Sequence, residues 1–129
     1  MGAICPCKGT KRRIVVDQVC FALPVLEDKT EDARAFFEEL ETQRKSDYAA
    51  SEQRINISKE SWHLQHSPQG DLLLAYIESP DFANAIGMFS QSQDAFDQWF
   101  KRRIAEVTGI DLNDPPPGPL SEPLSSYEA

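Results

Sequence analysis

The sequence predicts a small α+β domain, and three observations support this prediction. A β-rich segment at residues 12–23 precedes segments with helical spacing of apolar residues. A strong turn signal at residues 67–70 joins two further β-rich segments. The chain has 129 residues, enough for one domain with its own core. We therefore divide it into a flexible basic leader (1–11), a domain (12–112) and a proline-rich tail (113–129).

The strands are expected at residues 12–23, 59–66 and 71–78. The first carries apolar residues on both alternating sets, so both of its faces should be covered. Cys20 falls in this strand and is expected to be a small buried residue. The third strand is apolar on both faces, with Leu72, Leu74 and Tyr76 on one and Leu73, Ala75 and Ile77 on the other.

The first helix is predicted from a capping box at its start. Asp28 is the N-cap acceptor and Glu31 stands at N3. The polar run that follows contains neither glycine nor proline, so this helix should continue to about residue 54, anchored by Tyr48 and Ala49.

The second half of the chain carries two more helix signals. Ser79 is the expected N-cap of a helix with Pro80 at N1. A second capping pattern at residues 90–93 predicts a break, followed by a helix over residues 94–108. Gly109 should end that helix, after three cations that suit its negative end, Lys101, Arg102 and Arg103.

This order of elements favours a split βαβ, or ferredoxin-like, sandwich. Its first and third strands pair side by side, and its helices cover one face of an antiparallel sheet. The tail would add an edge strand built on Leu120, Leu124 and Tyr127. Since the strands are apolar on both faces, a second copy of the chain is expected to cover the other face. We expect a homodimer whose two sheets pack face to face into a barrel.

Three stretches carry a family resemblance. They are INISKESWHLQ (55–65), PQGDLLLAYIE (68–78) and SPDF (79–82), followed by Phe89, Ser90, Phe96, Trp99 and Phe100. Over residues 12–128 the chain resembles the dimeric α+β barrel superfamily, and within it an uncharacterised bacterial branch. The resemblance implies a pocket between sheet and helices in each subunit. Members include cofactor-independent monooxygenases, isomerases, stress-responsive proteins and heme-degrading enzymes.

Composition excludes several classes of partner. Thirteen basic and 21 acidic residues give a net charge of −8, which argues against nucleic acid. The longest apolar runs, 14–16 and 72–77, are far too short to span a bilayer, so no membrane partner is expected. Three cysteines without a secretory signal favour a cytoplasmic location. Cys5 and Cys7 form a lone C-x-C pattern in the leader, and no metal site is expected.

The candidate site combines a few polar residues with aromatic ones. Glu60 or His63 is the candidate acid or base, and Tyr76 is the candidate orienting donor. Glu60 lies on a strand suited to burial, so it needs hydrogen-bond partners or a raised pKa. Residues three apart on a strand point to opposite faces, so Glu60 and His63 serve different sides. The candidate ligand-binding residues are Trp62, Phe89, Ser90, Asp94 and Trp99.

A structural interpretation of the same residues stays open. Ser90 would cap a helix, Asp94 would offset the helix dipole, and Glu60 would pair with an arginine, namely Arg34, Arg54 or Arg103. His63 and His66 point to opposite faces and cannot share a metal ion, although either one is a candidate axial ligand for heme.

We expect a homodimer that binds a small apolar or aromatic molecule and needs no cofactor. The enzyme activity that the resemblance implies is that of a cofactor-independent monooxygenase or isomerase. The alternatives are a non-catalytic small-molecule-binding or stress-related dimer and, more remotely, a heme-handling protein.

Overall fold

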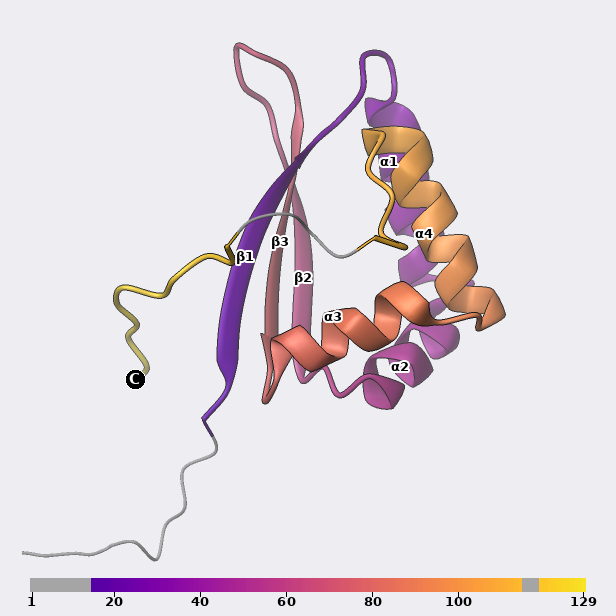
Figure 1. Cartoon of the computed structure of the whole chain (residues 1–129). Helices are drawn as coiled ribbons and strands as arrows, with labels where there is room; N and C mark the ends of the chain where they lie inside the picture. Colours follow the sequence, from indigo (N-terminus) through magenta and orange to yellow (C-terminus); the bar gives the residue numbers. More distant parts are fainter. Residues whose placement is uncertain (1–14, 115–118) are drawn as a thin grey trace, which may run out of the picture.

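The computed structural model describes residues 15–114 and 119–129, and it has one layer of strands and one of helices (Figure 1). The elements along the chain are β1 (Asp17–Pro24), α1 (Thr30–Glu41), α2 (Lys45–Arg54), β2 (Lys59–Gln65), β3 (Leu72–Ser79), α3 (Phe82–Gln91) and α4 (Ala95–Thr108). The predicted α+β class is confirmed. The leader, with Cys5 and Cys7, lies outside the described residues.

The strands form one antiparallel sheet in the order β1-β3-β2. The central strand is β3, in which Tyr76 pairs with Cys20 of β1 on one side and with Ser61 of β2 on the other. The predicted pairing of the first and third strands is therefore confirmed. Gly70 lies in the hairpin turn with φ +125°, a backbone conformation that residues other than glycine rarely adopt.

The four helices lie on one face of this sheet, as Figure 1 shows. Burial alternates along β3, since Leu73, Ala75 and Ile77 are buried under the helices, whereas Leu72, Leu74 and Tyr76 are partly exposed. The second set belongs to the opposite face, which no helix of the described chain covers. We call this opposite surface the open face.

The start of α1 differs from the predicted capping box. The helix begins at Thr30 after Lys29, and no side chain caps it. Asp28 instead has φ 65°, which places it outside the N-cap conformation. The hydroxyl of Thr30 donates a 2.5 Å hydrogen bond to Oδ2 of Asp71, so the first turn is tied to the start of β3 rather than to its own backbone.

The predicted long first helix is two helices. Helix α1 ends at Glu41, and α2 begins at Lys45. At the break, the hydroxyl of Thr42 donates to the carbonyl of Glu38, a back-bond that competes with continued helix. The polar run has no apolar stripe to hold it along the direction of α1, and Ala49 is exposed instead of acting as an anchor.

The start of α3 also differs from the prediction, because its N-cap is not Ser79. Asp81 is the N-cap, and its carboxylate accepts from the backbone N–H of Asn84. Ser79 is occupied elsewhere, because its hydroxyl donates to the carbonyl of Asn56 and accepts from the N–H of Asp81. This contact ties the end of β3 to the segment before β2.

The break between α3 and α4 is confirmed. Asp94 caps α4 by accepting from the N–H groups of Phe96 and Asp97. Gly109 ends the helix at φ 77°, as expected for a C-terminal glycine. The last turn of α4 contains no basic residue, so the expectation that Lys101, Arg102 and Arg103 suit this helix end is wrong.

The core consists largely of aromatic rings between the two layers. Phe36 of α1 lies 5.3 Å from Trp99 and 5.2 Å from Phe100 of α4, centroid to centroid, in edge-to-face geometry. These contacts hold the two long helices together over the sheet. Within the described ranges, no helix has the length and apolar character needed to cross a membrane.

Two expectations about the β1 edge are wrong. Cys20 is exposed, because its side chain belongs to the open face. Residues 119–129 start beside β1 and then run away from it (Figure 1), they form no strand, and Leu124 and Tyr127 are 89% and 90% exposed. Pro119 and Pro123 have no N–H to donate to a strand ladder. The backbone N–H of Cys20 instead donates to the hydroxyl of Ser121 at 2.9 Å.

Candidate functional site

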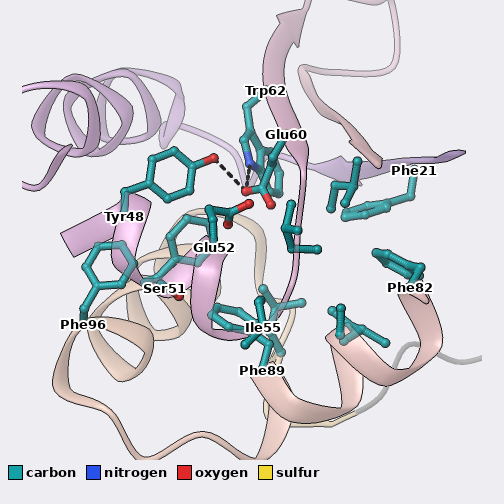
Figure 2. A pocket seen from close by; sticks show the side chains of 16 residues that line it. Phe21, Tyr48, Ser51, Glu52, Ile55, Glu60, Trp62, Phe82, Phe89 and Phe96 are labelled. Atoms are coloured by element: carbon teal, nitrogen blue, oxygen red, sulfur yellow. Dashed lines mark hydrogen bonds between the residues drawn. The ribbon is translucent and has the colours of Figure 1, made fainter. Parts of the chain in front are cut away.

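A cavity of about 50 Å³ lies between the inner face of the sheet and helices α2, α3 and α4 (Figure 2). Its wall is mostly apolar, and its five phenylalanines are Phe21 from β1, Phe82 and Phe89 from α3, and Phe96 and Phe100 from α4. On this measure a single water needs about 10–15 Å³, so the space holds roughly three to five water-sized groups. A largely apolar space of this kind is a candidate ligand site.

The polar corner of the cavity consists of two glutamates and their neighbours. Oε2 of Glu60 accepts a hydrogen bond from the hydroxyl of Tyr48 and another from Nε1 of Trp62, both at 2.8 Å. Figure 2 shows the carboxyl group of Glu52 beside that of Glu60. Two carboxyl groups that lie this close in a buried place repel each other when both are ionised, which favours a proton on one of them.

Burial changes the acidity of this pair. Burial and the adjacent charge of Glu60 raise the pKa of Glu52 to about 9. Burial also raises the pKa of Glu60, although the hydrogen bonds from Trp62, Tyr48 and Glu52 act in the opposite direction. At neutral pH, Glu52 therefore keeps its proton, and the pair carries less than two negative charges.

The glutamate pair has no cationic partner among the described residues. Neither Glu52 nor Glu60 forms a salt bridge there. The three arginines considered for Glu60 pair with other carboxylates: Arg34 with Glu31, Arg54 with Asp94 and Asp97, and Arg103 with Glu39 and Glu106. The interpretation of Glu60 as half of an ion pair is thus wrong.

Behind the cavity wall, Asp97 joins α4 to α2. Its fully buried carboxylate accepts from the hydroxyls of Ser51 at 2.5 Å and Ser92 at 2.6 Å, and from Arg54 at 2.9 Å. Burial raises the pKa of Asp97, but these donors outweigh burial and hold it below the ordinary value. Ser51 also lines the cavity, so this network fixes the position of one wall.

Lys101 joins α4 to the end of α3. Only 1% of this residue is exposed, and its ammonium group donates to the carbonyls of Phe89, Ser90 and Ser92 at 2.8–3.1 Å. A cation therefore meets the negative C-terminal end of α3. Burial lowers the pKa of Lys101. The lysine sets the angle between the two helices that carry most of the cavity's phenylalanines.

The structure brings three of the eight predicted site residues into the cavity wall: Glu60, Trp62 and Phe89. Glu60 has hydrogen-bond partners and a raised pKa, both of which its place on an apolar strand predicted.

His63 and Tyr76 lie on the open face, away from the cavity. Nε2 of His63 is 3.2 Å from the hydroxyl oxygen of Ser61. The hydroxyl of Tyr76 donates to Oε2 of Glu78 at 2.6 Å, and this bond raises the pKa of Tyr76 to about 12. The prediction that Glu60 and His63 face opposite sides is confirmed, so Tyr76 and His63 cannot assist Glu60 within this chain.

The other three predicted residues belong to α3 and α4 and do not line the cavity. Asp94 caps α4, in agreement with the structural interpretation. Ser90 caps no helix, and its buried hydroxyl has no hydrogen-bond partner in the described chain. Trp99 is buried in the core, with the guanidinium of Arg44 4.3 Å above its ring.

The residues that sequence reasoning missed are on α2. Tyr48 and Glu52 are four residues apart, so they share one face of the helix, and that face meets Glu60. The four-residue spacing is visible in the sequence, but the polar residues around it indicated a helix exposed to solvent.

Metal ligation finds no support in the described part of the chain, where no three His, Cys, Asp or Glu side chains converge. His66 follows the end of β2 and contacts Oδ1 of Asp71 at 2.7 Å through Nδ1.

No protein-family model matches the chain, and the comparisons with curated proteins and solved structures found no match. The resemblance to dimeric α+β barrel proteins stays a prediction, and the function has to be inferred from the cavity and its glutamate pair.

Proposed function

We propose that this protein binds a small, largely apolar molecule in the cavity, with Glu52 and Glu60 as the polar groups that recognise it. One observation carries the proposal: two neighbouring carboxyl groups, with the pKa of Glu52 raised to about 9, lie at the wall of an otherwise apolar cavity. Apolar pockets with a few convergent polar groups of shifted pKa are typical of ligand sites. Asp97 and Lys101 hold the wall in place without entering the cavity.

Filling the cavity tests this proposal. Ala85 lines the cavity on α3, and Ala83 is exposed on the same helix. The indole N–H signal of Trp62 in NMR spectra should shift saturably when n-butanol or butanone is added. Ala85→Leu should abolish this shift, and Ala83→Leu should leave it unchanged. Absence of saturable binding in the unaltered protein, or equal binding by Ala85→Leu, would contradict the proposal.

A second function is favoured by the proton that the pair holds. Glu60 is a base and Glu52 an acid on the same wall, which is the arrangement for moving a proton within a ketone. Glu60 would take a proton from the carbon beside the carbonyl, while Glu52 gives its proton to the carbonyl oxygen to form an enol. With a β,γ-unsaturated ketone the product is a dienol, and Glu60 returns its proton to the γ-carbon while the enol hydroxyl returns a proton to Glu52. The double bond moves into conjugation, which completes an isomerisation. The monooxygenase activity implied by the resemblance stays a prediction.

Exchange of ketone hydrogens tests the isomerase reaction. In deuterated water, the protein should accelerate the loss of the α-proton signals of butanone, and Glu60→Gln should abolish the acceleration. Glu38→Gln changes an exposed glutamate outside the cavity and serves as the control. If butanone binds but its exchange is no faster than in buffer, the protein is a binder rather than an isomerase.

We propose, in addition, that two copies pair through their open faces, following the ferredoxin-like plan. The order β1-β3-β2 supports this plan, because it corresponds to three of that plan's four strands. Leu72, Leu74 and Tyr76 run along the centre of the open face and are partly exposed. The cavity lies on the helix side, so each copy keeps its own site. A cytoplasmic location stays a prediction.

A further inference from the structure

The side chains that line the cavity include two carboxyl groups but no cationic group. None of its 16 lining residues is lysine, arginine or histidine. The nearby cations are engaged elsewhere, since Arg54 binds Asp94 and Asp97, and Lys101 binds backbone carbonyls. The negative charge shared by Glu52 and Glu60 is thus balanced by hydrogen bonds alone. A cavity with this charge favours a cationic group in its ligand.

The aromatic rings at the same corner also suit a cation. Tyr48 lies 6.4 Å from Phe96 and 6.5 Å from Phe100, centroid to centroid, and Trp62 lies 6.1 Å from Phe100. The negative faces of such rings attract ammonium groups, and their apolar surface accommodates a hydrocarbon chain. Aromatic rings and carboxyl groups together form a receptor for amines rather than for acids.

We propose that the ligand of this cavity is a small alkylamine, bound as its ammonium ion between Glu52 and Glu60 with its carbon chain among the aromatic rings. This inference rests on the proposed ligand-binding function and names its substrate class. Binding involves no bond to carbon: the ammonium keeps its protons, and the proton that Glu52 carried is released to solvent. The cavity volume suits a chain of about four carbons.

The glutamate pair is also accessible from outside the cavity. Tyr48, Glu52, Ile57 and Glu60 line the cavity and also a shallow surface depression next to it, so they form the wall between the two. An amine arriving in the depression meets the carboxyl groups first.

The charged groups around this wall are of both signs. The depression is lined by Glu41, Lys45 and Lys59. On the side of α4, the charge of Asp97, which is paired with Arg54, contributes to the raised pKa of Glu52. Glu52 is the member of this group that loses a proton when an ammonium binds, because the pKa of Glu52 lies near 9. Amine affinity should therefore rise about tenfold per pH unit between pH 6 and 8, one proton being released per ligand. Alkylamines stay protonated there, with a pKa close to that of lysine, about 10.4.

Calorimetric titration with n-butylamine and n-butanol tests the proposal. These probes differ only in the amine and hydroxyl groups. At pH 8 butylamine should bind at least tenfold more tightly than butanol, and its binding enthalpy should vary with the buffer in proportion to one released proton. The affinity for butanol should not change with pH.

Two variants separate the amine site from the apolar cavity. Glu52→Gln resembles the protonated glutamate in shape and still donates to Glu60, so it should bind butanol as before. Its affinity for butylamine should fall at least tenfold at pH 8 and lose its pH dependence. Glu38→Gln, an exposed change outside the cavity, should behave like the unaltered protein.

The possible results distinguish the amine inference from the proposed apolar binding function. Equal affinity for both probes, or butylamine binding without proton release, overturns the amine inference and leaves the apolar binding function standing. Saturable binding of neither probe overturns both. The pH dependence and proton release are measured on the unaltered protein, so the decision does not depend on a variant folding.

Discussion

The hydroxyl of Tyr48 donates to Oε2 of Glu60 at 2.8 Å and thereby joins α2 to the edge strand β2. Burial raises the pKa of Tyr48, so its hydroxyl remains a donor across the whole range in which proteins are stable. Ser51 is the one buried residue of α2. Polar contacts, rather than an apolar stripe, therefore hold this helix against the cavity.

Tyr48→Phe should lower the free energy of unfolding by about 1–2 kcal/mol. The variant keeps the ring but removes a hydrogen bond to a charged group. Urea denaturation at pH 7 measures the change. Tyr127→Phe is the control, because Tyr127 is 90% exposed and its hydroxyl should contribute nothing measurable. Equal stability of both variants would show that the bond to Glu60 does not support α2.

The stability of the fold should decrease as pH rises from 5 to 9. The pKa of Glu52 is about 9 in the folded chain and 4.5 as a free side chain, so folding takes up a proton between these values. Stability from this group is complete below pH 4.5 and is lost as the pH approaches 9. One proton contributes a slope of at most about 1.4 kcal/mol per pH unit.

Glu52→Gln should flatten this pH profile, because glutamine has no proton to lose. Urea denaturation at pH 6, 7 and 8 compares the variant with the unaltered protein. Parallel profiles for the two proteins would mean that Glu52 does not carry the shared proton.

Lys101→Met should destabilise the fold by about 3 kcal/mol. Methionine fills much of the same space but leaves the carbonyls of Phe89, Ser90 and Ser92 without their shared donor. The neighbouring Arg102 is exposed, so Arg102→Met is the matched control and should change stability by less than about 0.5 kcal/mol. Thermal unfolding of both variants measures the difference. A small effect at Lys101 would show that water replaces the ammonium group.

Leu74→Lys should convert a dimer into a monomer without unfolding it. Leu74 lies on the open face of the central strand and is partly exposed in a single chain, so a lysine there is tolerated only when nothing packs against it. Sedimentation at micromolar concentration should give twice the chain mass of 14.5 kDa for the unaltered protein and 14.5 kDa for the variant. Gln69→Lys in the exposed hairpin turn should remain dimeric. A monomeric unaltered protein would refute face-to-face pairing.

The strands were predictable because their signals are local. The short apolar run from Leu72 to Ile77 directly follows the turn at Gly70, and these two local signals predict a hairpin with little help from the rest of the chain. Helix starts were less predictable because several acceptors compete at each one. Asp81 rather than Ser79 caps α3, since the hydroxyl of Ser79 is engaged by the loop before β2.

Only part of the candidate site was predictable, because sequence patterns show local signals and not the contacts between distant elements. Glu60 stood out because a carboxylate is unusual on a strand suited to burial. Glu52 did not stand out, because it lies in a polar run and becomes special only where α2 turns toward β2. His63 and Tyr76 were correctly seen as strand residues, but their face of the sheet depends on the register with β3 and on which side the helices cover.

The shared proton of Glu52 and Glu60 is measured most directly by following the side-chain carboxyl carbons of both residues by NMR from pH 4 to 10. The account predicts that the pair gives up a proton near pH 9, in a step that moves both signals, and that Glu52→Gln removes this step. Titration of both glutamates near about 4.3, the value of an unperturbed side chain, would contradict it.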